Sequence, residues 1–137
     1  AWPPIRYRRS VDYRRNPPLR RQSPSAAPWQ VRKIESYIEA NWDQPMTIEA
    51  LALVAGGSAR ALFHAFHTSR GYSPMDFAKR IRLQKAKEML SRPNASTSVT
   101  SVAFTCGFSN LGHFAVYYHK AFGEPPSATL RRARRRD

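Results

Sequence analysis

The chain has 137 residues, of which 42% are hydrophobic, with a formal net charge of +14 and one cysteine. This size suits a single small domain or two small lobes that share a helix, and the charge favours a polyanionic partner. The composition excludes an internal disulfide framework, and the sequence contains neither an apolar run long enough to span a membrane nor a signal peptide.

Residues 1–28 are rich in arginine and proline and show no helical period. We interpret them as a solvated linker, with an arm that contacts DNA as the alternative. Seven Arg and one Asp give this segment a net charge of +6, and residues 131–137 add +4 from five Arg and one Asp. Only +4 remains for the central 102 residues, so we expect the two ends to raise non-specific affinity for phosphate without choosing a sequence.

A first helix is predicted to begin near Trp29 and to end before Pro45, because apolar residues recur there at helical spacing. Two further helices are predicted over 47–54 and 59–69. These two are separated by a short turn that contains two glycines and a serine. This arrangement is typical of a helix-turn-helix.

Five residues support the helix-turn-helix prediction. Ala52 is small enough for two helices to cross closely, and Gly56 suits the left-handed conformation that ends the first helix. Ser58 can accept a hydrogen bond from the unpaired N–H groups at the start of the second helix. Leu62 and Phe66 lie four residues apart and should pack that helix on the core. Its opposite face is left for a partner.

A long central helix is predicted over 74–91. Ser73 supplies the cap, Pro74 occupies the first helical position, and Asp76 lies at the third. No glycine or proline follows Pro74 in this stretch, so we expect a stiff spacer of roughly 25 Å. Its predicted buried residues are Phe77, Ile81, Ala86 and Leu90.

The chain then repeats the helix-turn-helix pattern at an offset of 51 residues. Ala103, Gly107 and Ser109 take the places of the small residue, the turn glycine and the serine cap. One inserted residue then brings Phe114 and Tyr118 into the places of the two buried anchors. The recurrence of matched caps and anchors is a strong signal, whereas one such motif would be a weak one.

Together these elements predict an all-α fold of seven helices, in which a long central helix joins two helix-turn-helix subdomains. After the linker 1–28, the predicted DNA-binding domain covers 29–135. Its parts are a first helix-turn-helix over about 47–69, the linker helix over about 74–91, a second helix-turn-helix over about 98–122, and a short seventh helix that runs into the arginine tail.

Four stretches of this pattern resemble the DNA-binding domain of the AraC/XylS transcriptional regulators. They are M-T-I-E-A-L-A from Met46, S-A-R-A-L-F-H-A-F from Ser58, S-P-M-D-F-A-K-R-I-R-L-Q-K-A from Ser73 and, most specific, A-F-T-C-G-F-S-N-L-G-H-F-A-V-Y-Y-H-K-A-F-G-E-P-P-S from Ala103. The resemblance covers roughly three-quarters of the chain. It implies a bacterial, cytoplasmic, nucleoid-associated regulator that binds double-stranded DNA sequence-specifically and usually activates transcription.

The resemblance also implies partners. Members of the family typically carry a separate N-terminal domain for effector binding or dimerisation, and residues 1–28 are expected to be the linker from such a domain or its end. A small-molecule effector is expected only through that domain, and RNA polymerase is the expected protein partner. No cofactor, metal ion, membrane contact or catalytic residue is expected.

In this family the second helix of each pair lies in the major groove. Carried over to this chain, the base-facing candidates of the first pair are Arg60, Phe63, His64 and His67; those of the second pair are Asn110, Leu111, Gly112, His113, Val116 and His119. Arg60 is the strongest candidate, because its planar fork can bond O6 and N7 of guanine together. The predicted helix caps or phosphate contacts are Ser58, Ser73 and Ser109.

Two residues depart from the family pattern. Val116 stands where relatives often have arginine, and Thr129 stands where they often have an aromatic residue. With Leu111 and Gly112 nearby, the second recognition helix offers few hydrogen-bonding groups to bases. We therefore expect the helix over 59–69 to carry more sequence specificity than its counterpart.

Other functions were weighed against DNA reading. The four histidines lack an HExxH motif or paired cysteines that would complete a metal site, and Cys106 is predicted to be a buried small residue in the last turn of its helix. The strongest competitor is a sequence-blind nucleic-acid-binding or architectural protein driven by its arginine tails. A protein–protein module is the third alternative.

Overall fold

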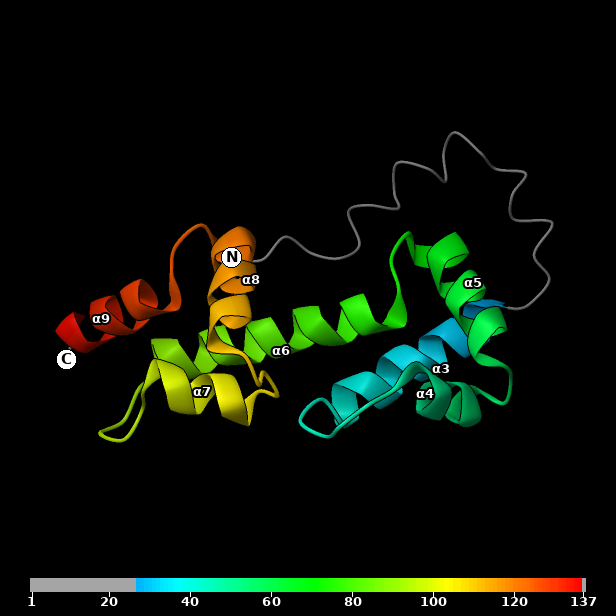
Figure 1. The fold of residues 1–137 in the computed structure, drawn as a ribbon, viewed down its shortest axis with the longest axis horizontal. Helices are drawn as coiled ribbons and strands as arrows, with labels where there is room; N and C mark the ends of the chain where they lie inside the picture. The colour runs from blue at the N-terminus through cyan, green and yellow to red at the C-terminus, as the bar shows by residue number, and fades with distance from the viewer. Residues whose placement is uncertain (1–26, 137) are drawn as a thin grey trace. The chain divides into compact units, whose positions relative to one another are not determined.

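The computed structural model describes residues 27–136, so the predicted linker lies outside the described residues, apart from its last two. Within 27–136 the chain forms seven helices and no strand, which confirms the all-α prediction (Figure 1). None of these helices combines the length and apolarity that a membrane crossing requires. The helices are α3 (Ala27–Ala40), α4 (Ile48–Ala55), α5 (Ala59–Arg70), α6 (Pro74–Ser91), α7 (Val99–Thr105), α8 (Leu111–Phe122) and α9 (Pro126–Arg136).

The described chain divides into two compact units. The N-terminal unit comprises 27–41 and 46–78 and holds α3, α4, α5 and the first turn of α6. The C-terminal unit comprises 42–45 and 79–136 and holds the rest of α6 with α7, α8 and α9. Each unit contains one predicted helix-turn-helix, and each has its own core.

The core of the N-terminal unit is built on α3. Val31, Ile34 and Ile38 are fully buried at helical spacing, and Leu62 and Phe66 of α5 are buried as predicted. Between α4 and α5, Gly56 adopts a left-handed conformation (φ 80°), and its N–H donates to the carbonyl of Ala52 at 2.9 Å. This closes the turn that sets the direction of α5. Pro74 and Tyr72 are also buried in the same unit.

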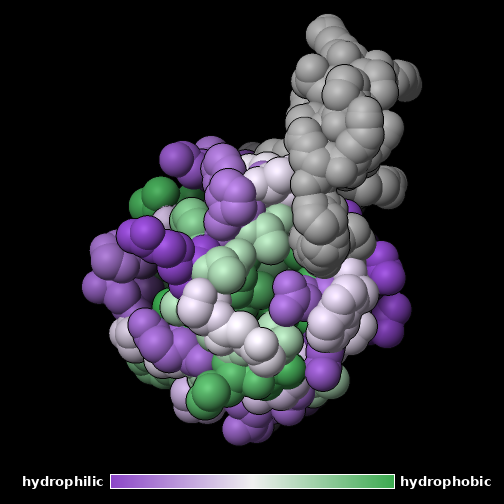
Figure 2. Space-filling model, turned by 90° about the vertical axis from the view of Figure 1, so that its right-hand side faces the viewer, coloured by the Kyte–Doolittle hydropathy of each residue, from purple (hydrophilic) through white to green (hydrophobic). Residues whose placement is uncertain are grey.

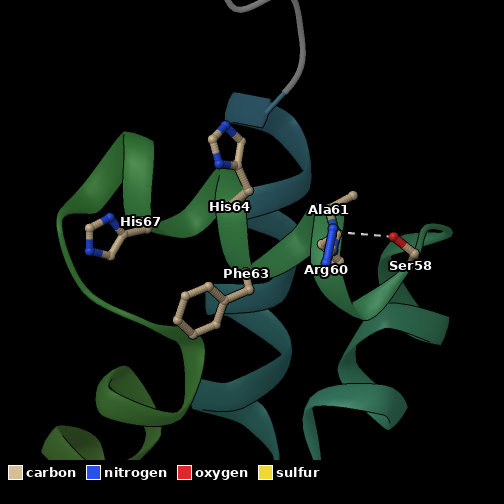
Figure 3. Close-up of a pocket in the computed structure, with 6 residues that line it drawn as sticks. All are labelled: Ser58, Arg60, Ala61, Phe63, His64 and His67. Carbon is tan, nitrogen blue, oxygen red and sulfur yellow. Dashed lines mark hydrogen bonds between the residues drawn. The ribbon is translucent and has the colours of Figure 1, made fainter.

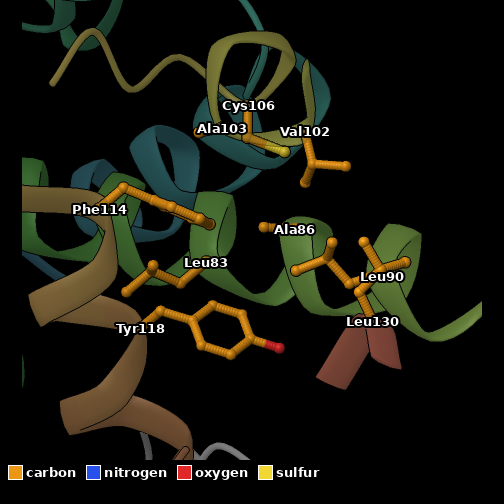
Figure 4. Packing of buried hydrophobic residues seen from close by; sticks show 9 residues of the cluster. All are labelled: Leu83, Ala86, Leu90, Val102, Ala103, Cys106, Phe114, Tyr118 and Leu130. Atoms are coloured by element: carbon orange, nitrogen blue, oxygen red, sulfur yellow. The ribbon is translucent and has the colours of Figure 1, made fainter. Parts of the chain in front are cut away.

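The core of the C-terminal unit includes both predicted anchors of α8 (Figure 4). Phe114 and Tyr118 are fully buried. Ala103 of α7 is also buried, as expected of a small residue where two helices cross closely. Cys106 follows the last turn of α7 and is also fully buried. Burial raises the pKa of the Cys106 thiol to about 11, which disfavours the reactive thiolate. The cluster consists of Leu83, Ala86, Leu90, Val102, Ala103, Cys106, Phe114, Tyr118 and Leu130.

The predicted buried face of α6 needs one correction. Ile81 is only partly buried, whereas Leu83, which was not predicted, is 1% exposed and belongs to the C-terminal core. The helix crosses the boundary between the two units, so its buried residues belong to two cores. Phe77 packs in the N-terminal unit, and the core contact of α6 continues with Leu83 and Ala86 in the other unit.

The predicted arginine tail is also corrected, because residues 131–136 form the second half of α9. One face of this helix is buried, with Leu130 and Ala133 packed in the C-terminal unit. These apolar residues lie three apart, so they give the arginine-rich segment a core-facing side. The arginines between and beyond them are therefore held on a helix surface.

Candidate nucleic-acid interface

The start of α5 is held by the predicted serine cap. Ser58 has an extended backbone, and its hydroxyl accepts from the N–H of Ala61 at 3.0 Å. At the other end, Arg70 donates two hydrogen bonds to the carboxylate of Glu35 on α3, at 2.7 and 3.0 Å. The helix is thus fastened at both ends, and its buried anchors turn the opposite face outward.

The four predicted base-facing residues of α5 share that outward face. Arg60, Phe63, His64 and His67 are all exposed, and they line one pocket together with Ser58 (Figure 3). Their spacing of three, four and seven residues places them on one side of a helix. The rings of Phe63 and His67 are nearly parallel, with centroids 6.3 Å apart. The structure therefore brings this candidate set together.

The chemistry of this face suits a base edge. Arg60 carries five N–H donors, and each imidazole can donate or accept a hydrogen bond. Phe63 leaves 48% of its surface exposed, which provides an apolar contact beside these polar groups. Figure 2 shows apolar side chains exposed among hydrophilic ones on the side that carries α3 to α5. A face with donors and an apolar patch can bond purine acceptors and touch a thymine methyl group.

The start of α8 differs from the prediction. Asn110, not Ser109, is the cap: its side-chain oxygen accepts from the N–H of His113 at 2.8 Å. The residue inserted in the second copy moves the helix start by one position, so the cap moves from the serine to the asparagine. Gly112 lies against this cap, since a Cβ there would be 3.3 Å from the Asn110 oxygen. Ser73, by contrast, caps α6 as predicted, accepting from the N–H of Asp76 at 3.1 Å.

The other predicted base-facing residues of α8 are also exposed. Val116 lies on the side opposite the buried anchors, whereas Leu111 lies three residues before Phe114, in the exposed first turn. Val116 is 55% exposed and Leu111 39%, while His113 and His119 are the members of the set within α8 that can form side-chain hydrogen bonds. This set therefore combines two apolar side chains with two histidines and lacks an arginine, in contrast to that of α5. The exposed set is Asn110, Leu111, Gly112, His113, Val116 and His119.

A chain of hydrogen bonds ties α8 to α9. The Tyr118 hydroxyl donates to the Thr129 hydroxyl at 2.8 Å, and Thr129 donates to the carboxylate of Glu124. Arg132 donates two bonds to the same carboxylate, at 2.7 and 2.8 Å. The hydrogen bonds from Arg132 and then Thr129 lower the pKa of Glu124 to about 2. Burial raises the pKa of Tyr118, whose hydroxyl is thus kept as a donor.

Thr129 was predicted only to depart from the family pattern, and this network was not predicted. Thr129 is 2% exposed, so its hydroxyl needs partners within the protein. The signal that would have found it is a polar residue within the apolar spacing of α9, next to Leu130. Thr129 thus provides a hydrogen-bonding link between α9 and α8.

Arg82 lies against the turn of the second helix-turn-helix, a contact that was not predicted. Arg82 of α6 donates to the carbonyls of Trp42 and Gln44, both at 2.8 Å, and burial lowers its pKa. Gly107 has φ 94°, and a Cβ there would lie 3.3 Å from the Arg82 guanidinium. Glycine is therefore required at this turn both for its conformation and for the close approach of Arg82.

Among the residues that the structure describes, no group of three His, Cys, Asp or Glu side chains is placed to hold a metal ion. Within this part of the chain, the exposed faces of α5 and α8 are the surfaces on which the predicted functional residues gather.

Comparison with known proteins also identifies a helix-turn-helix domain in this chain. The helix-turn-helix domain family matches residues 51–132. The chain is 42% identical over 107 residues to the probable thc operon regulatory protein of Rhodococcus erythropolis, covering 77% of this chain and 32% of that one. It is 35% identical over 104 residues to the XylDLEGF operon transcriptional activator of Pseudomonas putida, covering 75% and 32%. The chain thus spans about a third of the length of these relatives.

A solved structure is also similar. The probable AraC family transcriptional regulator from Rhodopseudomonas palustris CGA009 is 59% identical to this chain, with a TM-score of 0.73. The match covers 76% of this chain and 96% of the solved chain. The likeness therefore extends over almost the whole of that structure.

Proposed function

Because the chain belongs to the helix-turn-helix family of AraC/XylS regulators, as their C-terminal DNA-binding domain, we propose that it binds double-stranded DNA sequence-specifically through α5 and α8. The two helices enter successive turns of the major groove on one face of the duplex, about 34 Å apart. The whole protein then acts as a transcription regulator, most simply an activator, in a bacterial cytoplasm.

One observation carries this proposal. All ten predicted base-facing residues are exposed, on or directly before two helices whose opposite sides are buried. A helix that merely completed a core would have no reason to keep Phe63, Leu111 and Val116 at its surface. The same exposure at matched positions of two repeats favours a partner that itself repeats, as the groove of B-DNA does.

The two helices have different roles in this proposal. Arg60, His64 and His67 make α5 the main reader of bases, with Arg60 bonding guanine. The apolar face of α8 contacts thymine methyl groups and responds to groove shape, while His119 contacts phosphate. Asn110 keeps its side-chain oxygen on the helix cap, so only its amide group remains for DNA.

Selection of bound sites from random duplexes tests the proposal. We expect two short conserved blocks about one helical turn apart, with the stronger block assigned to α5 by repeating the selection with Arg60→Ala. A parallel selection with Val116→Ala should alter only the weaker block. Recovery of no preferred sequence would refute sequence-specific binding, and one block unaffected by either substitution would refute the assignment to these helices.

The competing function, sequence-blind binding, is favoured by the exposed arginines of α9. Deleting residues 131–137 would not test it cleanly, because the deletion removes Ala133 from the core. We therefore use a chain without residues 1–26 in which Arg131, Arg135 and Arg136 are replaced by Gln. A specific regulator keeps its preferred site while losing overall affinity and salt dependence, whereas a sequence-blind binder loses nearly all binding.

Partners beyond DNA follow from the relatives and belong to the longer protein. Both curated relatives are named as operon regulators, and one as an activator. We infer contact with RNA polymerase at the promoter, and effector control through a domain outside this chain. Transcription in vitro from a template carrying the selected site tests the first: added protein should increase transcript yield, and unchanged or reduced yield would contradict activation.

A further inference from the structure

We propose that the exposed arginine face of α9, formed by Arg131 and Arg135 beside Ser127, is a second DNA contact that clamps the phosphate backbone beside the site of α8. The proposal rests on the proposed function, since it needs α8 to bind DNA. It adds a surface outside both recognition helices. Its ligand is the phosphodiester backbone, and it carries no sequence preference.

The arginines of α9 divide into two classes by their partners. Arg132 is paired with Glu124, at 2.7 Å. Arg134 donates to the carbonyls of Thr97 and Asn94, at 2.7 and 3.3 Å. These two guanidinium groups therefore serve the internal structure of the C-terminal unit.

Arg131 and Arg135 are different. Both are exposed, and within residues 27–136 no carboxylate is paired with either of them. They lie four apart on the same side of the helix, where two like charges destabilise the helix slightly. A helix that needed only solubility or a favourable dipole could place these charges apart, so their juxtaposition favours an anionic partner.

The shape of this face also fits a phosphate strand. Ser127, Leu130, Arg131, Arg134 and Arg135 line a pocket on α9. Arg131 and Arg135 are separated by ~6 Å along the helix axis, so the two forks can bond different phosphates of one strand. A hydroxyl from Ser127 extends the same row by one turn.

A short connection and a chain of hydrogen bonds link α9 to α8 within the C-terminal unit. Only 123–125 separate α8 from α9, and the bonds from Tyr118 through Thr129 to Glu124 hold the two helices together within one unit. Burial of Thr129, Leu130 and Ala133 puts Arg131 and Arg135 on the outer side of α9. The proposal assigns this side to the phosphates that flank the α8 block.

The test compares wild type with Arg131→Gln/Arg135→Gln on the selected duplex and on an unrelated duplex of equal length. We expect the affinity for both duplexes to fall by the same factor and the base preference to stay unchanged. The slope of log K against log salt should become shallower by about 1.8, the value for two phosphate contacts. A matched control, Arg32→Gln/Arg92→Gln, removes two exposed charges from other surfaces. An equal effect of the control would reduce the result to net charge and overturn the proposal.

A second measurement locates the contact. Neutral methylphosphonate linkages are placed in the flank beside the α8 block, or in the opposite flank. Wild type should lose affinity only for the first duplex, and the double variant should be indifferent to both. Unchanged binding by the double variant overturns this inference alone, provided wild type selects a site. If wild type selects no site, the proposed function itself fails. Glutamine is a good helix former, so circular dichroism should confirm that α9 is retained.

Discussion

The two units use one helix-turn-helix scaffold and fasten its second helix in different ways. In the N-terminal unit, α5 is tied by the ion pair of Arg70 with Glu35, and its outer face carries an arginine and two histidines. In the C-terminal unit, α8 is tied through Tyr118 and Thr129 to α9, and its exposed residues include two apolar side chains and two histidines but no arginine. Duplication has thus kept the buried anchors while the exposed face and the fastening diverged.

This difference suggests that the two helices contribute in different ways to base discrimination and to overall affinity. A helix rich in donors gains specificity from each hydrogen bond that the wrong base leaves unmade. An apolar helix gains less discrimination per contact, and it benefits more from a rigid mount and from nearby phosphate contacts. In the C-terminal unit the network of Glu124 provides the first feature, and the arginines of α9 are proposed to provide the second.

The largest expected effect is on the two buried anchors. Phe66→Ala and Phe114→Ala each remove a fully buried ring and should cost about 3–5 kcal/mol of the stability of their own unit. Hydrogen exchange checks this: Phe66→Ala should lower protection in α3 to α5, and Phe114→Ala in α7 to α9. Loss of protection in both units from either substitution would show that they unfold together and would weaken the comparison.

A smaller effect is expected on the reading face. Arg60→Ala should cost about 1–3 kcal/mol of binding to the selected duplex and relax one base position. Val116→Ala should cost less, because it removes only apolar contact. Titration of labelled duplexes measures both, with Arg32→Ala as a control for an exposed charge in the same unit. Equal weakening by Arg60→Ala on all sequences would make Arg60 a phosphate contact and remove the asymmetry between the helices.

The next effect in size concerns the hydrogen bond that links α8 to α9. Thr129→Val deprives the buried Tyr118 hydroxyl of its acceptor and should cost about 1–2 kcal/mol of unfolding free energy. Adding Tyr118→Phe removes the unsatisfied group, so the double variant should lose less than the sum of the two single ones. Urea unfolding measures the three values. Strict additivity would show that the hydrogen bond does not couple α8 to α9.

The smallest effect is the pH dependence of Glu124. The pKa of Glu124 is about 2 in the folded protein, compared with an ordinary value of 4.5. The ionised carboxylate therefore contributes its full share of the unfolding free energy above about pH 4.5, and this contribution is lost as the pH falls to about 2. Glu124→Gln should therefore lower the unfolding free energy at neutral pH. The difference in unfolding free energy between wild type and this variant should shrink as the pH falls from about 4.5 to about 2. Thermal unfolding at several pH values checks this, with the exposed Glu88→Gln as control. A difference that grows toward low pH would contradict the assignment.

Much of the architecture was predictable because it depends on neighbours along the chain. Helical spacing placed the buried anchors Phe66 and Phe114, and the start of α6 followed from Ser73 and Asp76, whose groups bond within one turn. The exposure of the base-facing set followed for the same reason, since burying one side of a short helix leaves the other outside. What these residues bind stays a prediction.

Other features depend on residues that meet only when the chain folds. Local rules allowed either Ser109 or Asn110 to cap α8, and the folded chain gives this role to Asn110. Because α6 passes from one core to another, Leu83 is buried and Ile81 is only partly buried, although both are apolar and two residues apart. Spacing within a helix states which residues can share a face, whereas the choice among those faces depends on the partner that covers them.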